Sequence, residues 1–390
     1  MALKKGTAGN DTISGTTAAD DIYGYAGNDH LTGNSGNDRI WGGDGGDRVL
    51  ADAGNDQVWG DGGNDTLSGG SGNDIMWGGS GRDTIYGDAG TDEIHGGSED
   101  DIIYGGLEFD VLYGDAGNDT FYTSGWDDVF GGDGNDTIYG GGGTVHGDAG
   151  NDTIYIGDFG SGDAGNDTFI FELGRDAGSN DQGMSFSNGG IGFDTFRFIN
   201  NSDNPYMITQ ISPYFAGFSD PRDAADGLPS GTMGNLQNFE RYEAVGNHAL
   251  HYNGIGTDAD IQVAGDTKND IFLGGAGDET LEGRAGNDVF DGGEGINVYI
   301  GGTGADEFRL GPDDGLSYVR GFEGAGVTGG DRIVIDRWDG AVTAPNAYTT
   351  NIVQTTAGHT LIQLADDGVV LATLDIDKVG LKFGDDYLFV

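Results

Sequence analysis

Aspartate side chains that recur every nine residues are the groups in this chain best placed to do chemistry. They occupy the sixth position of a repeat, GGxGxDxUx, in which U is apolar; GGSGNDIMW (69–77) and GGSGRDTIY (78–86) are the clearest copies. Carboxylates and turn carbonyls are hard oxygen ligands, and neither His nor Cys occupies a regular position of the repeat. Such a ligand set favours calcium over zinc or copper. The spacing therefore predicts multiple Ca²⁺ sites.

The same repeat predicts the fold. From Gly6 to Tyr122 thirteen nonapeptides follow one another without insertion, and all thirteen have an apolar residue at U. Each unit offers about six turn residues and a short strand whose side chains alternate out, in, out. Two units make one coil, and coils stack about 4.8 Å apart by parallel pairing. We expect an all-β fold: a parallel β-roll (right-handed β-solenoid) with a short irregular insert and a C-terminal β cap.

With two units per coil, the aspartates form two rows, one along each turn edge. The first row is Asp11, Asp29, Asp47, Asp65, Asp83, Asp101 and Asp119. The second is Asp38, Asp56, Asp74, Asp92 and Asp110, preceded by Asp20 as its weakest member, because its unit GTTAADDIY is poor in glycine. Carboxylates about 5 Å apart repel by roughly 3 kcal/mol per neighbouring pair at an effective dielectric near 20. A cation between neighbours reverses the sign, so we expect the rows to close only with Ca²⁺.

The periodicity changes after Tyr122, where TSGWDDVF is one residue short. Later units add the predicted ligands Asp136, Asp152, Asp167 and Asp194. A second array adds Asp270, Asp288 and Asp306. In that array Glu279 and Asn297 stand where the repeat has aspartate, so its rows are expected to be interrupted.

Composition restricts the partners. The 390 residues include 66 acidic and 17 basic side chains, a formal net charge of −49. That charge argues against nucleic acid and anionic membranes as partners and leaves cations as the counter-charge. The chain has no cysteine, so no disulfide compensates for its small apolar content, and no apolar run is long enough to span a membrane. The start, MALKKGTAGND, lacks the apolar segment of a cleavable signal.

These units resemble the repeats-in-toxin (RTX) family of calcium-binding β-rolls, over residues 6–197 and 254–309. The resemblance implies export of the unfolded chain through a type I secretion channel, an uncleaved C-terminal signal, and folding on calcium outside the cell. DRIVI (331–335) and TLIQLADDGVVLATL are similar to the strands that cap such repeats. The chain's last six residues resemble the acidic-then-apolar ending of the family's protease branch; they are Asp385, Asp386, Tyr387, Leu388, Phe389 and Val390. The expected location is extracellular, secreted or at the cell surface.

Four segments follow from these patterns. We expect a main roll (1–197), an aromatic and proline-rich connector or docking insert (198–253), a second short roll (254–309), and a C-terminal β cap with the secretion signal (310–390).

No catalytic motif stands out in the sequence. RTX proteins normally carry a toxin, protease, lipase or epimerase module before the repeats, whereas five residues precede them here. The chain has no HExxH or GxSxG motif, and the pair His248 and His251 in HALH lacks a nearby third ligand. We expect a non-enzymatic, secreted calcium-binding protein of a surface layer, extracellular fibre or matrix. The alternative is an accessory module of a secreted polysaccharide-modifying enzyme or adhesin.

Two features point to partners. Outward aromatic residues on alternate units form a predicted partner surface: Tyr23, Trp41, Trp59, Trp77 and Tyr113. Stacked rings either stabilise the solenoid alone, at about 0.2 to 1 kcal/mol per pair, or form a platform for a protein or cell-surface glycan. The other feature is the start of the roll, because Met1–Lys5 is too short to cover it. Head-to-tail or lattice self-assembly is expected there, with Lys4 and Lys5 facing an acidic neighbour.

Overall fold

The structure of the chain is a computed structural model in which every regular element of the described residues is a β-strand. It describes residues 2–124, 126–140, 143–155, 159–173, 186–188, 191, 194–200, 207–212, 215–219, 235–237, 241–246, 251–253, 260–311, 314–322, 330–335, 349–354, 360–366, 369–376 and 387–389. Two compact units are present. Unit 1 is Met1–Phe171 with Met184–Asp194, and unit 2 is Glu172–Gly183 with Thr195–Val390.

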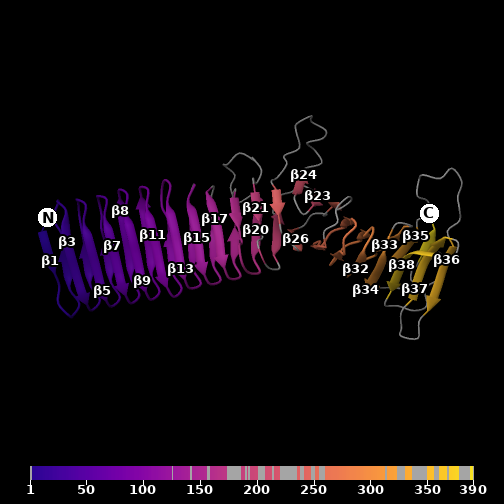
Figure 1. Ribbon diagram of the computed structural model, residues 1–390, viewed down its shortest axis with the longest axis horizontal. Helices are drawn as coiled ribbons and strands as arrows, with labels where there is room; N and C mark the ends of the chain where they lie inside the picture. The colour runs from indigo at the N-terminus through magenta and orange to yellow at the C-terminus, as the bar shows by residue number, and fades with distance from the viewer. Residues whose placement is uncertain are drawn as a thin grey trace, which may run out of the picture. The chain divides into compact units, whose positions relative to one another are not determined.

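Unit 1 consists of two parallel sheets whose strands alternate along the chain (Figure 1). Sheet A contains β1 (Ala2–Lys5), β3 (Asp20–Ala26), β5 (Arg39–Asp44), β7 (Gln57–Gly62), β9 (Ile75–Ser80), β11 (Glu93–Ser98), β13 (Val111–Ala116), β15 (Asp128–Asp133), β17 (Thr144–Ala149), β19 (Phe159–Ser161) and β21 (Phe186–Asn188). Sheet B contains β2 (Thr12–Ser14), β4 (His30–Thr32), β6 (Arg48–Leu50), β8 (Thr66–Ser71), β10 (Thr84–Ala89), β12 (Ile102–Tyr104), β14 (Thr120–Tyr122), β16 (Thr137–Tyr139), β18 (Thr153–Tyr155) and β20 (Thr168–Leu173). The predicted all-β parallel solenoid is therefore confirmed.

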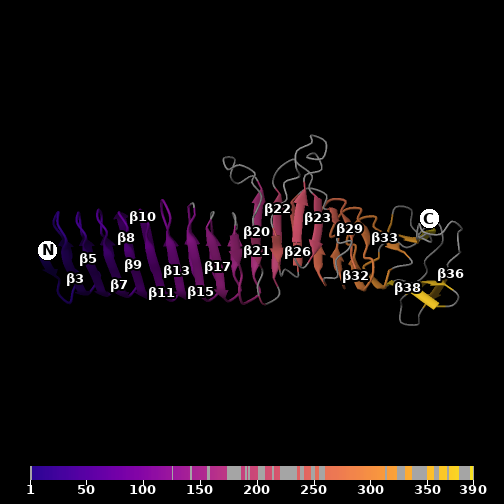
Figure 2. The same ribbon diagram turned by 45° about the horizontal axis from the view of Figure 1, so that its top comes forward.

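The register of unit 1 stacks each repeat position on the same position of the next coil. In sheet A, Ile40 pairs with Val58 and Trp41 with Trp59. The U residues point inward and form a core one side chain wide per strand. Those with no exposed surface in the first thirteen units are Ile22, Leu31, Ile40, Val49, Val58, Leu67, Met76, Ile85, Ile94, Ile103, Leu112 and Phe121. Figure 2 shows the same strands as successive rungs.

The phase slips in the sequence are absorbed without breaking the stack. The backbone N–H of each row aspartate donates to a carboxylate in the next coil, and this link spans 18 residues from Asp101 to Asp119. It spans 17 residues from Asp119 to Asp136 and 15 from Asp152 to Asp167. The turns change length, whereas the hydrogen bonds that align the coils stay the same. The register therefore depends on the aspartate link and not on a constant repeat length.

In unit 2 the strands again pair mainly in parallel, and they are described as two sets, C and D. Sheet C contains β24 (Phe215–Ser219), β23 (Met207–Ser212), β27 (His251–Asn253), β29 (Ile271–Leu273), β31 (Val289–Asp291), β33 (Glu307–Leu310), β35 (Arg332–Ile335) and β39 (Tyr387–Phe389). Sheet D contains β22 (Thr195–Asn200), β26 (Arg241–Gly246), β28 (Gln262–Ala264), β30 (Thr280–Glu282), β32 (Ile296–Ile300), β34 (Leu316–Arg320) and β38 (Val369–Ile376). An antiparallel pair, β36 (Thr349–Gln354) and β37 (Thr360–Asp366), joins β38. Parallel pairing therefore runs past residue 309, and the DRIVI segment lies within it as β35.

Several predicted features lie outside the described residues. These include Asp385 and Asp386 of the expected secretion signal, His248 of the HALH pair, and most of the 198–253 insert. Within the part of the chain that is described, no helix is long and apolar enough to cross a membrane.

Candidate metal centre

A single coil shows how the repeat positions its carboxylate. Asp65 lies in the turn that ends β7, and its Oδ1 accepts the backbone N–H of Asp47 at 2.6 Å. Its own N–H donates to Asp83 Oδ1 at 2.8 Å. The other oxygen, Oδ2, turns back to the start of the same turn, where a Cβ on Gly60 would overlap it. The first glycine of the repeat is therefore required because the carboxylate occupies the space of its side chain.

These Oδ2 atoms are buried and have no hydrogen-bond partner. In unit 1 the described aspartates that share this property are Asp29, Asp38, Asp47, Asp56, Asp65, Asp74, Asp83, Asp92, Asp101, Asp110, Asp119, Asp136, Asp152 and Asp167. A buried carboxylate oxygen without a partner is costly, and a cation removes that cost. Because the free atoms are hard oxygens repeated along both edges, the residues fit Ca²⁺.

Burial also changes the acidity of the rows. It raises the pKa of Asp65 to about 8, and the neighbouring Asp83 and Asp47 add to the shift. Burial raises the pKa of Asp119 to about 8 and that of Asp56 to about 7. Protons and a metal ion therefore compete for the same oxygens near neutral pH.

The first aspartate of each row differs from the others. Asp11 Oδ2 accepts hydrogen bonds from the Thr7 N–H at 2.6 Å and the Thr7 hydroxyl at 2.9 Å. Asp20 Oδ2 accepts the equivalent pair from Thr16, at 2.6 and 2.8 Å. Threonine stands here where later units have glycine or another residue. Asp20, the weakest member by sequence, is fully buried and aligned in its row, but both carboxylates have protein donors at the oxygen that is free elsewhere.

Two row members were missed by the sequence analysis. Asp127 Oδ1 accepts the Asp110 N–H at 3.0 Å, and Asp331 Oδ1 accepts the Asp306 N–H at 3.0 Å. Both are buried. Their signal was an aspartate two residues after a glycine and two residues before an apolar residue, Val129 or Ile333, as in the repeat.

Unit 2 has different chemistry on its two edges. On one edge Asp270, Asp288 and Asp306 are linked as in unit 1, with N–H to Oδ1 distances of 2.7 and 2.9 Å. On the other, Asn297 Oδ1 accepts the Glu279 N–H at 2.9 Å. The Asn297 amide nitrogen donates to the turn carbonyls of Glu294, at 2.9 Å, and Gly293, at 3.3 Å. A neutral amide thus satisfies turn oxygens by itself, without a cation.

The outward aromatic residues of sheet A form a continuous stack. Ring centroids of Tyr23 and Trp41 are 4.4 Å apart, those of Trp41 and Trp59 4.7 Å, and those of Trp59 and Trp77 5.0 Å, with interplanar angles of 2° to 6°. The stack continues through His95 to Tyr113. Ring faces lie against one another, so a sugar ring has access only to edges. This geometry favours a stabilising contribution over a flat glycan platform.

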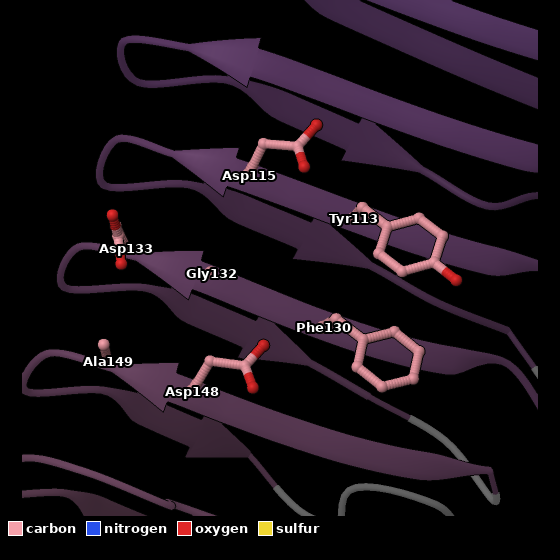
Figure 3. A pocket seen from close by; sticks show the side chains of 7 residues that line it. All are labelled: Tyr113, Asp115, Phe130, Gly132, Asp133, Asp148 and Ala149. Carbon is pink, nitrogen blue, oxygen red and sulfur yellow. The ribbon is translucent and has the colours of Figure 1, made fainter.

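A hollow of about 390 Å³ lies on the surface of sheet A at Gly132. Figure 3 shows Asp115 and Asp148 projecting from the coils on either side of Gly132, with Tyr113 and Phe130 beside them. The hollow exists because Gly132 has no side chain where the neighbouring coils have aspartate. It presents carboxylates and ring edges to a ligand.

Comparison with known proteins agrees with this geometry. The sequence profile described as "RTX calcium-binding nonapeptide repeat (4 copies)" matches overlapping windows that extend over residues 5–177 and again over 262–308, more than half of the chain. The fold and the acidic rows define a calcium-binding β-roll, and the chain belongs to the RTX calcium-binding nonapeptide repeat family.

Among solved structures, the chain is similar to the extracellular lipase LipA from Serratia marcescens, with 17% sequence identity and a TM-score of 0.22. The match covers 68% of this chain and 40% of the lipase, so the chain spans less than half of that protein. No curated protein sequence matches the chain.

Proposed function

We propose that the chain is a secreted calcium-binding structural protein whose main roll becomes a rigid stack when calcium enters its acidic rows. The observation that carries this proposal is the series of buried, unpaired Oδ2 atoms along both edges of unit 1. Bound calcium neutralises the negative charge of these carboxylates, and the aspartate links between coils hold the carboxylates in register. Sites with one carboxylate per turn are in the weak range of extracellular modules, which fill outside the cell.

The decisive experiment compares the purified chain with and without calcium. Circular dichroism is expected to show a β-rich chain in calcium and loss of that signal in excess chelator, with electron microscopy showing ordered particles only in calcium. A β-rich signal that persists unchanged in chelator would contradict the proposal.

The proposed function is non-enzymatic. Its support is that the chemistry-bearing side chains of unit 1 are used to hold coils together: row carboxylates along the edges and stacked rings on sheet A. Assays on alginate-like and other polyuronates in calcium test this point. Turnover of any of them would replace the structural function by the enzymatic one.

Association into a surface layer, fibre or matrix is the finer part of the proposal. Its support is an exposed apolar group on two successive turns of one edge: Leu107, Phe109 and Trp126, with exposed fractions of 62%, 41% and 66%. Exposed apolar groups of this kind mark interaction sites more often than free surface. We assign them to contact between copies of the chain, because the sheet A ring faces are already covered by one another.

Light scattering in calcium tests this assignment. The wild-type chain is expected to form oligomers, and Trp126→Ser with Leu107→Ser is expected to reduce them. Leu3→Ser is the matched control, since Leu3 is 61% exposed but lies in β1 at the start of the roll. Disruption by Leu3→Ser alone would move the contact to the end of the roll, as the sequence predicted. A monomeric wild-type chain would remove self-assembly.

The alternative, an accessory or adhesin module, has one observation in its favour. The hollow above Gly132 offers the carboxylates of Asp115 and Asp133, which can accept hydrogen bonds from sugar hydroxyls. Glycan binding in calcium that Asp115→Asn abolishes would favour this alternative.

A further inference from the structure

His146 lies at the end of the sheet A ring stack, away from the acidic rows. Its ring stacks on Phe130, with centroids 5.3 Å apart and an interplanar angle of 2°. The next coil has Ser161 at the paired position, so no further ring follows. The imidazole is therefore fixed by stacking on one side and opens toward polar groups on the other.

Two carboxylates converge on this imidazole. Asp148 lies two residues after His146 on β17. Asp163 lies in the next coil, and its Oδ2 is 2.8 Å from His146 Nδ1. One ligand atom from each of the three side chains lies within 4.8 Å of the other two. Asp163 is held in place because Ser161 Oγ donates to its Oδ1 at 2.7 Å. Among the described residues this is the one such group of three.

The convergence depends on the shortened coil. The Asp152 to Asp167 link spans 15 residues, whereas the coils around His95 are linked over 18. The residues two positions after the ring position of each coil form a column across the coils. At the short coil, two successive members of this column are aspartates, Asp148 and Asp163. In the longer coils an aspartate in that column lies beside glycine, as Asp61 lies between Gly43 and Gly79.

His95 also has two carboxylates near its ring, but they do not converge on one ring nitrogen. Its Nε2 is 3.3 Å from Glu93 Oε1, and its Nδ1 is 3.4 Å from Asp115 Oδ2. The two carboxylates thus contact different ring nitrogens and cannot share one ion with a single nitrogen. His146 and His95 each have two nearby carboxylates, but the carboxylates are arranged differently around the ring. His95 is therefore a matched control.

We propose that His146, Asp148 and Asp163 form a binding site for a divalent transition-metal ion of the Zn²⁺ type, separate from the calcium rows. An imidazole nitrogen with two carboxylates suits zinc, whereas calcium takes oxygen ligands. Nδ1 offers its lone pair to the ion in the tautomer that carries the proton on Nε2, and the ion replaces the hydrogen bond between His146 and Asp163. The side chains of His146 and Asp163 are 34% and 36% exposed, so solvent ligands complete the coordination. The bound ion joins two successive coils of the roll.

The test is calorimetric titration of the full chain with zinc chloride in saturating calcium, which keeps the acidic rows occupied. We expect His146→Asn to remove one equivalent of bound zinc relative to wild type, and His95→Asn to remove none. Asp163→Asn, which keeps the size and a hydrogen-bonding group, is expected to remove the same equivalent. Ser161→Ala is expected to weaken it by about tenfold, as for other groups that orient a ligand.

Circular dichroism in calcium checks that each variant folds, and Asp163→Asn serves if His146→Asn does not. Equal zinc binding by wild type and Asp163→Asn would overturn the site. Loss of the same equivalent in His95→Asn would also overturn it, because the binding would then depend on the ring stack and not on the converging ligands.

Discussion

In unit 1 both turn edges carry successive buried carboxylates with an unpaired oxygen, whereas in unit 2 one edge combines such a carboxylate, Glu279, with the amide of Asn297, which donates to turn carbonyls. Both units stack parallel coils by the same backbone geometry. The difference is in what occupies the turn: a carboxylate that lacks a partner, or an amide that donates to the turn carbonyls. The comparison leads to the hypothesis that the need for a metal follows the charge on the sixth residue of the repeat and not the backbone of the solenoid.

Chelation is the strongest way to test this difference. We expect excess chelator to unfold unit 1 cooperatively, because a core one side chain wide cannot offset the chain entropy of folding without the metal. Unit 2 is expected to retain more protection on its Asn297 edge. Hydrogen exchange resolved by peptide measures both units in one sample. Equal protection of residues 30–120 and 260–320 at every calcium level would contradict the comparison.

Acidification of the calcium-free chain should have the next largest effect. Burial raises the pKa of Asp65 and Asp119 to about 8, above the ordinary value of 3.8. The folded state therefore binds protons more tightly than the unfolded state, so its stability falls as pH rises through the folded pKa and is regained on acidification. Circular dichroism in chelator is expected to show β structure returning as pH falls from about 8 to about 5.

Salt provides the control for the pH experiment. High ionic strength screens the general repulsion of a chain with net charge −49 but acts little on buried groups. A pH transition that disappears in high salt would show that net charge, and not the buried rows, is responsible.

Asp65→Asn gives unit 1 the chemistry of the Asn297 edge. The amide oxygen keeps the Asp47 N–H as donor, and the amide nitrogen can donate to turn carbonyls as Asn297 does. We expect the stability in calcium to fall by about 1 to 3 kcal/mol, as for loss of a partner from a buried charged group, while the calcium-free form is not weakened. Calcium titration followed by denaturant unfolding measures both. Asp61→Asn, at an exposed position of β7 outside the rows, should change both much less, because Asp61 contributes only a small part of the pKa shift of Asp65.

Asn297→Asp is the reverse change and the smallest expected effect. The new carboxylate loses the two donor contacts to turn carbonyls and places a charge beside buried Glu279. Unit 2 is then expected to be less stable in chelator, by about 1 to 3 kcal/mol, and to regain that stability in calcium. Exchange of peptides 275–300 is the measurement. A variant whose protection is insensitive to calcium would show that this edge cannot hold the ion.

The sequence predicted the parts of the structure that repeat locally. The nine-residue period determined the inward position of residues such as Ile40 and Val58, the parallel coil, and the alignment of Asp47, Asp65 and Asp83 in one row. It also predicted that Asn297 interrupts a row of metal ligands, which stays a prediction, whereas the inter-coil link continues there from the Glu279 N–H to Asn297 Oδ1. These predictions rest on covalent spacing and on side-chain alternation, which neighbouring coils inherit without any long-range information.

Only the tertiary structure decided which oxygens are free and which side chains meet. Thr7 satisfies Asp11, although Asp11 has the spacing of every other ligand. Asp127 joins its row across a slipped repeat, because the hydrogen bond from the next coil and not the period selects it. The coil that shortens to 15 residues brings Asp163 to His146. Such contacts join different coils, so their geometry depends on turn lengths and packing that a one-dimensional period does not contain.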